Sequence, residues 1–96
     1  MEFRDNVVIL TGASTGIGEA MAQQLAAQGA WLALAARNTA RLEAVAADCR
    51  ARGGRALVVP TDVTDQEECR ELIDRTVAEY GRIDTLINNA GLSMWM

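Results

Sequence analysis

The sequence predicts an α/β fold, in which an open parallel sheet is covered by helices on both faces. Apolar segments of strand length alternate with longer segments of helical periodicity, in the order β-α-β-α-β-α-β. The connections between them are short. The apolar segments lack polar alternation, which is typical of strands buried on both faces. Right-handed crossovers then predict a doubly wound sheet with strand order 3-2-1-4.

The four predicted strands are bounded by residues that break regular structure. Their ranges are 6–11, 31–35, 56–59 and 85–88. Pro60 closes the third strand, because proline lacks the N–H that a sheet ladder requires. We expect the first and fourth strands to lie side by side, so an asparagine at the end of the fourth could reach Thr11 or the backbone after it.

The three predicted helices carry start and stop signals. The first covers residues 16–28 and stops at Gly29. The second begins after Asn38 or Thr39, either of which is a suitable cap. The third begins with the capping box of Thr64 and Glu67 and stops at a glycine. The residues expected on the buried faces are Met21, Ala22, Leu25, Leu42, Val45, Ala46, Cys49, Cys69, Leu72, Ile73, Val77 and Tyr80.

Composition and charge exclude several classes of protein. A chain of 96 residues forms one domain at most. The net charge of −4 argues against binding to nucleic acid, since no basic stripe exists to neutralise phosphates. Neither a signal peptide nor a membrane span is predicted, so a cytoplasmic protein is expected. Cys49 and Cys69 lack metal-ligand spacing and the chain has no histidine, so no metal site is predicted.

A glycine-rich turn between the first strand and the first helix predicts a phosphate-binding site. Glycine permits sharp bending and close approach of a ligand to the backbone. The free N–H groups at the helix start favour an anion. The residues of this candidate site are Gly12, Ser14, Thr15, Gly16, Ile17 and Gly18. The alternative is a tight turn in which Gly18 serves only close packing.

Arg37, at the end of the second predicted strand, indicates the choice of dinucleotide. A dinucleotide site commonly has an acidic residue about 20 positions beyond the glycines, which binds the ribose 2′-hydroxyl. A guanidinium at that place favours a 2′-phosphate, and therefore NADP over NAD. The alternative is an ordinary exposed charge.

Two further groups of residues stand at the ends of strands. Asp62 and Val63, just past the third strand, are suited to contact an adenine through acceptor oxygens and apolar packing. For Asp62 the alternative is a local turn or helix-capping acid. Asn89, Ala90 and Gly91 follow the fourth strand, and the two small residues leave room for a ribose.

These residues together resemble the short-chain dehydrogenase/reductase family. The resemblance consists of Thr11-Gly12-(x)3-Gly16-Ile17-Gly18, Asp62-Val63 and Asn88-Asn89-Ala90-Gly91, and it covers nearly the whole chain. It implies a Rossmann-type domain, residues 1–96, that binds NAD(P)(H). The resemblance implies that the phosphates and adenosine ribose are surrounded by Gly12, Ser14, Gly16 and Ile17. It implies that Asp62 and Val63 contact the adenine and that the ribose side is lined by Asn89, Ala90 and Gly91. Arg37 matches the basic position that marks NADP-preferring members. Thr15 departs from many such members, which have a second basic residue there.

The catalytic motif of the family is missing. Family members transfer hydride between the nicotinamide and a carbonyl or alcohol, with a Tyr-x-x-x-Lys motif handling the proton. Tyr80 is the only tyrosine, Asp84 stands four residues later, and the chain has no lysine. No catalytic residue is therefore assigned, and Ser93 and Trp95 are expected at most to line the nicotinamide side.

We therefore expect the cofactor-binding portion of an NADP-dependent oxidoreductase, cut off before its catalytic half and inactive by itself. The alternative is a non-catalytic NADP(H)-sensing or interaction module. A methyltransferase-like domain is disfavoured, because its methyl donor requires an acid where Arg37 stands. The open edge of the strand at residues 85–88 and the apolar residues 92–96 predict self-association.

Overall fold

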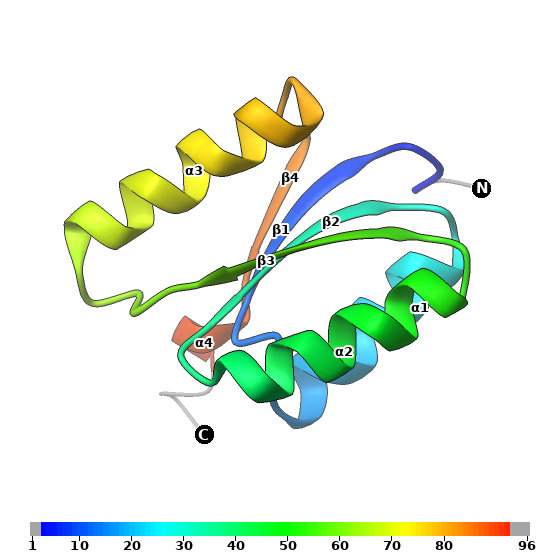
Figure 1. Ribbon diagram of the computed structural model, residues 1–96, viewed down its shortest axis with the longest axis horizontal. Coiled ribbons are helices and arrows are strands. Elements are labelled where there is room, and N and C mark those ends of the chain that lie inside the picture. The colour runs from blue at the N-terminus through cyan, green and yellow to red at the C-terminus, as the bar shows by residue number, and fades with distance from the viewer. Residues whose placement is uncertain (1–2, 93–96) are drawn as a thin grey trace.

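A four-stranded parallel sheet forms the centre of the molecule (Figure 1). The computed structural model describes residues 3–92. The order along the sheet is β3-β2-β1-β4 and every neighbouring pair is parallel, as the sequence predicts. The strands are β1 (Val7–Thr11), β2 (Trp31–Ala36), β3 (Arg55–Pro60) and β4 (Thr85–Asn88).

The register of the sheet determines which strand ends meet. Thr11, the last residue of β1, lies opposite Ala35 of β2 and opposite Asn88 of β4. All five residues of β1 are buried, which confirms a strand covered on both faces. The segments that follow β1, β2 and β4 therefore leave the sheet at one edge, which we call the carboxyl edge.

Helices cover both faces of the sheet (Figure 1). Helices α1 (Gly16–Ala27) and α2 (Thr39–Ala51) lie on one face, and α3 (Gln66–Tyr80) lies on the other, while α4 (Asn89–Leu92) is a single turn after β4. The larger core joins α1 and α2 to the sheet. Its buried residues include Val8, Leu10, Ala22, Leu25, Leu32, Leu34, Leu42, Val45, Ala46 and Cys49.

Helix α2 starts and packs as predicted. Asn38 is its N-cap, and the Asn38 side chain accepts a hydrogen bond from the amide of Arg41 at 3.1 Å. The four residues predicted on its inner face, Leu42, Val45, Ala46 and Cys49, are all buried.

The predicted start of α3 is wrong. The cap is Asp65, whose carboxylate accepts hydrogen bonds from the amides of Glu67 and Glu68 at 2.9 and 3.2 Å. Thr64 has the right residue type for a capping box, but its hydroxyl donates to the Asp62 carboxylate at 2.6 Å. A local turn before the helix therefore competes successfully for this side chain.

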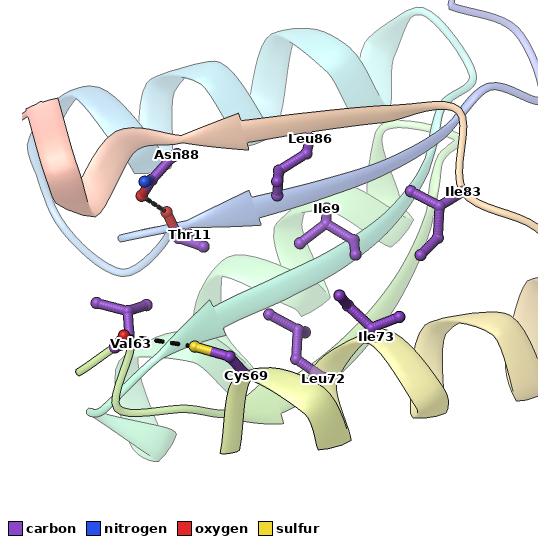
Figure 2. Close-up of a pocket in the computed structure, with 9 residues that line it drawn as sticks. All are labelled: Ile9, Thr11, Val63, Cys69, Leu72, Ile73, Ile83, Leu86 and Asn88. Carbon is purple, nitrogen blue, oxygen red and sulfur yellow. Dashed lines mark hydrogen bonds between the residues drawn. The ribbon is translucent and has the colours of Figure 1, made fainter. Parts of the chain in front are cut away.

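The predicted buried face of α3 is also partly wrong. Leu72 and Tyr80 are buried, but Ile73 and Val77 are 47% and 44% exposed. Thr76 takes the inner position instead. Helix α3 packs on β2 and β3, so its side toward β1 and β4 stays open. Figure 2 shows Ile73 facing the space beside Ile9 and Leu86.

Tyr80 is committed to packing at the end of the sheet opposite the carboxyl edge. Its hydroxyl donates to the Leu32 carbonyl at 2.8 Å, and its ring centre lies 5.7 Å from that of Trp31, the first residue of β2. Burial raises the pKa of Tyr80 to about 12. Arg55 lies 4.4 Å over the Trp31 ring and completes the cluster. The only tyrosine of the chain thus has a structural role.

The two cysteines differ in environment. Cys49 is buried, and burial raises its pKa to about 11. The sequence predicts that Cys69 is buried too, but the structure leaves it half-buried, because it lies on the open side of α3. Within residues 3–92 no cluster of three His, Cys, Asp or Glu side chains is suited to hold a metal ion. No helix in this range is long and apolar enough to cross a membrane.

Acid is expected to weaken the start of the sheet through Asp84. Its carboxylate accepts a hydrogen bond from the Val7 amide at 2.8 Å and pairs with Arg82 at 2.9 Å, and these contacts lower its pKa. The pKa in the folded state then lies below the unfolded value of about 3.9. The stabilisation is therefore present above that value and is lost as the pH falls through the folded pKa.

The measurement is the melting temperature between about pH 2 and pH 7, where stability of this origin changes. Below about pH 4 the wild type should lose stability more steeply than Asp84→Asn, which has no carboxylate to protonate. Asp48→Asn, which removes an exposed acid paired with Arg52, is the control and should follow the wild type. Parallel curves for wild type and Asp84→Asn would contradict this account of Asp84.

Candidate functional site

The glycine turn after β1 has a backbone that other residues would strain or block. Gly12 and Gly16 have φ values of +66° and +36°, in the left-handed region that favours glycine. A Cβ on Gly18 would overlap the Gly12 carbonyl oxygen and come within 2.7 Å of the Asn89 amide nitrogen. Gly18 therefore does serve close packing, as the alternative interpretation of the sequence holds, and this packing also shapes the glycine turn.

Side chains from the end of β4 fix the turn in place. The Thr11 hydroxyl donates to Oδ1 of Asn88 at 2.9 Å and accepts a hydrogen bond from the Ala90 amide at 3.2 Å. Asn89 is buried, with 7% of its surface exposed, and its side-chain amide donates to the Gly12 carbonyl at 3.2 Å. These contacts confirm the prediction that asparagine at the end of the fourth strand reaches Thr11 and the glycine turn.

Arg37 and Asp62 meet at the same edge. Arg37 directly follows β2, Asp62 lies in the loop after β3, and Nη2 of Arg37 lies 2.9 Å from Oδ2 of Asp62. The other carboxylate oxygen accepts hydrogen bonds from the Thr64 amide and hydroxyl. Hydrogen bonds from Thr64, and then from Arg37, lower the pKa of Asp62 to about 2. Asp62 therefore is a turn-forming acid, and it also faces the candidate site.

A cleft of about 330 Å³ lies between the glycine turn and this ion pair. It brings together seven of the residues that the sequence assigned to a nucleotide. The predicted residues in its lining are Gly12, Ser14, Thr15, Arg37, Asp62, Val63 and Ala90, and Ala36, Asn38, Thr61 and Thr64 complete it.

The remaining predicted residues lie around this cleft rather than in its lining. Gly16, Ile17 and Gly18 form the first turn of α1, where Ile17 is 66% exposed. Asn89 lies beneath the turn, and Gly91 belongs to α4. Ser93 and Trp95 lie outside the described residues.

Arg41 is a residue of this region that the sequence analysis missed. Its Nε donates to the Ser14 carbonyl at 3.2 Å, and its Nη2 pairs with Glu19 of α1 at 2.9 Å. It thereby links α2 to the glycine turn and to α1. The only signal in the sequence that could have pointed to Arg41 is its place three residues after the Asn38 cap. The contact itself depends on how α1 and α2 pack, which the sequence pattern does not show.

A second, apolar pocket lies on the other face of the sheet, between α3 and β4 (Figure 2). Its volume is about 230 Å³, and apolar side chains dominate the lining, which consists of Ile9, Thr11, Val63, Cys69, Leu72, Ile73, Ile83, Leu86 and Asn88. Leu86, on the edge strand β4, is 61% exposed. Self-association through β4 and residues 92–96 stays a prediction, and residues 93–96 lie outside the described part of the chain.

The parallel sheet, the glycine turn and the cleft at the carboxyl edge define a Rossmann-type nucleotide-binding domain. Comparison with known families makes the class more specific. The family described as short chain dehydrogenase matches residues 6–96, and the chain belongs to this family of oxidoreductases, whose members bind NAD(P).

Individual relatives agree with this assignment. The 11-beta-hydroxysteroid dehydrogenase-like 3 protein of Arabidopsis thaliana is 49% identical over 87 residues, which are 90% of this chain and 28% of that protein. An NAD+-bound xylitol dehydrogenase superposes with a TM-score of 0.86 at 36% identity, over 90% of this chain and 33% of that one. A metagenomic short-chain oxidoreductase in complex with NADP superposes with a TM-score of 0.83 at 34% identity, over 90% of this chain and 39% of that one. The chain thus spans about a third of the length of these relatives.

Proposed function

We propose that residues 1–96 form the NADP(H)-binding portion of a short-chain oxidoreductase that transfers hydride between NADP(H) and a carbonyl or alcohol substrate. The observation that carries the proposal is the cleft at the carboxyl edge. It joins the glycine turn to Arg37, whose side chain is 77% exposed and is the one basic side chain among the described residues that line the cleft. A guanidinium at this position suits a ribose 2′-phosphate.

Different residues in and around the cleft would contact different parts of the coenzyme. The turn from Gly12 to Gly18 would hold the phosphates, since glycines let a ligand come close to the backbone and the N–H groups at the start of α1 favour an anion. Asp62 and Val63 would contact the adenine. Asn89, Ala90 and Gly91 would line the ribose side. A Cβ at Gly12 would lie within 3.0 Å of the Ala90 amide nitrogen, so glycine is needed for the turn to pack this closely on the segment after β4.

The preference for NADP over NAD rests on Arg37 and on the lack of an acid at that position. The solved relatives include complexes with either coenzyme, so fold alone does not select between them. A guanidinium binds a phosphate bidentately, whereas a carboxylate there would repel it.

Isothermal titration calorimetry of the 96-residue chain with NADPH and NADH tests the proposal. We expect saturable binding of both, with NADPH the tighter ligand. No heat with either coenzyme, from protein that melts cooperatively, would overturn the proposal. Equal affinities would remove the NADP preference and leave nucleotide binding in place.

A second candidate function is an NADP(H)-sensing module without chemistry. Two observations favour it: the Tyr80 hydroxyl is engaged in a hydrogen bond to the Leu32 carbonyl, and the sequence contains no lysine. Under either candidate, NADPH oxidation by this chain with a panel of carbonyl compounds should stay at background. The reading frame beyond Met96 separates the two: a continuing frame that encodes Tyr-x-x-x-Lys supports the oxidoreductase.

A further inference from the structure

Arg37 and Asp62, which the proposed function assigns to the same coenzyme, bind each other at the rim of the cleft. The contact joins Nη2 of Arg37 to Oδ2 of Asp62 at 2.9 Å, across 25 positions of sequence. The Arg37 side chain is 77% exposed and that of Asp62 is 29% exposed. Both residues line the cleft. Under the proposed function, the ion pair therefore lies where the adenosine end of the coenzyme would bind.

Asp62 is the firmly held partner of this pair. Its Oδ1 accepts hydrogen bonds from the Thr64 amide at 2.9 Å and from the Thr64 hydroxyl at 2.6 Å. Its own amide donates to the Glu68 carboxylate at 2.7 Å. The carboxylate is ionised at neutral pH, because its pKa is lowered to about 2. A fixed negative charge thus stands beside the basic group of the site.

We propose that Asp62 is a coenzyme-specificity residue that competes with the 2′-phosphate of NADP(H) for Arg37. This inference rests on the proposed function. Arg37 creates the preference for the phosphate, and Asp62 reduces it by holding the guanidinium and by repelling a second anion. NAD(H) lacks the 2′-phosphate, so its binding leaves the ion pair intact. The pair therefore sets how strongly the two coenzymes are distinguished.

The substitution Asp62→Asn separates these effects from folding. Asparagine keeps an oxygen that accepts the hydrogen bonds from Thr64, so the turn is preserved. It replaces Oδ2 by an amide that does not hold a guanidinium. Any loss of contact to adenine affects all adenine nucleotides alike.

The experiment measures the affinities of the chain for 2′,5′-ADP and 5′-AMP by calorimetry. Their ratio reports the 2′-phosphate alone, since the adenine contribution cancels. We expect Asp62→Asn to raise the preference for 2′,5′-ADP about fivefold, the upper range for release from an exposed ion pair. In the Arg37→Ala background the same substitution should change the ratio by less than about twofold, because no guanidinium remains to be released.

Asp65→Asn is the matched control, since it removes a carboxylate three residues away and asparagine still caps α3. It should leave the ratio within about twofold of the wild type. A ratio that is unchanged or lower in Asp62→Asn would overturn the inference, and so would an equal rise in the Arg37→Ala background or in Asp65→Asn. Failure of the wild type to bind either nucleotide would instead overturn the proposed function, and this inference with it.

Discussion

The Gly18→Ala variant should lose about 3 kcal/mol of stability, because the new methyl group overlaps the Gly12 carbonyl oxygen. The overlapping atom belongs to the backbone, which cannot move away without distorting the turn. The amide nitrogen of the Asn89 side chain would also lie 2.7 Å from the new Cβ. Within a helix, alanine is by itself more favourable than glycine by about 1 kcal/mol. A loss of stability in this variant therefore isolates the contact between α1 and the turn.

The measurement is thermal unfolding followed by circular dichroism. In a domain of this size a loss of 1 kcal/mol lowers the melting temperature by about 4–8 °C, so a fall of 10 °C or more is expected. Coenzyme binding should be lost as well. Gly53→Ala is the control for binding: its φ of +101° adds backbone strain that lowers stability, but no atom lies within 4 Å of the new Cβ, so coenzyme binding should be kept. A melting temperature of Gly18→Ala at or above that of the wild type would contradict the prediction.

The Arg37→Ala variant should bind NADPH about 10- to 100-fold more weakly while NADH binding changes little. Charge-assisted hydrogen bonds to a phosphate contribute roughly 1.5–3 kcal/mol, and each 1.4 kcal/mol corresponds to about tenfold in affinity. The Arg37 side chain has no role in the core, since it is 77% exposed, so folding should be preserved.

Titration of both coenzymes into both proteins provides the measurement. Arg52→Ala is a suitable control, because it removes an exposed arginine that is paired with Asp48 at the far end of α2. An equal loss of affinity for NADPH and NADH would assign Arg37 to a shared part of the coenzyme and not to the 2′-phosphate.

The strands show how far local patterns determine this fold. The range predicted for β4 is the one observed, and the other three differ by one residue at one or both ends. An unbroken apolar run between turn residues identifies a strand wherever it falls in the sheet. It does not by itself establish burial, since β1 is buried throughout while Leu86 on the edge strand β4 is 61% exposed. The strand order follows too, because parallel strands with short helical connections have few allowed arrangements.

Helix α3 shows where local patterns fail. Ile73 and Val77 have the spacing of a buried face, yet Leu72, Thr76 and Tyr80 point toward the sheet. Periodicity indicates that a helix has an apolar side, but the position of the helix over the strands decides how much of that side is covered. In this structure α3 covers β2 and β3, and the rest of its apolar side borders the pocket next to β4.

The sequence by itself determined the sheet, the glycine turn and the identity of most residues around the cleft, because strand, turn and helix signals act between near neighbours in the chain. Only the tertiary structure decided that Arg37 pairs with Asp62 and that Arg41 reaches Ser14. These partners are 25 and 27 positions apart. Contacts over such separations depend on how helices pack on the sheet, and no periodicity in the sequence encodes that packing.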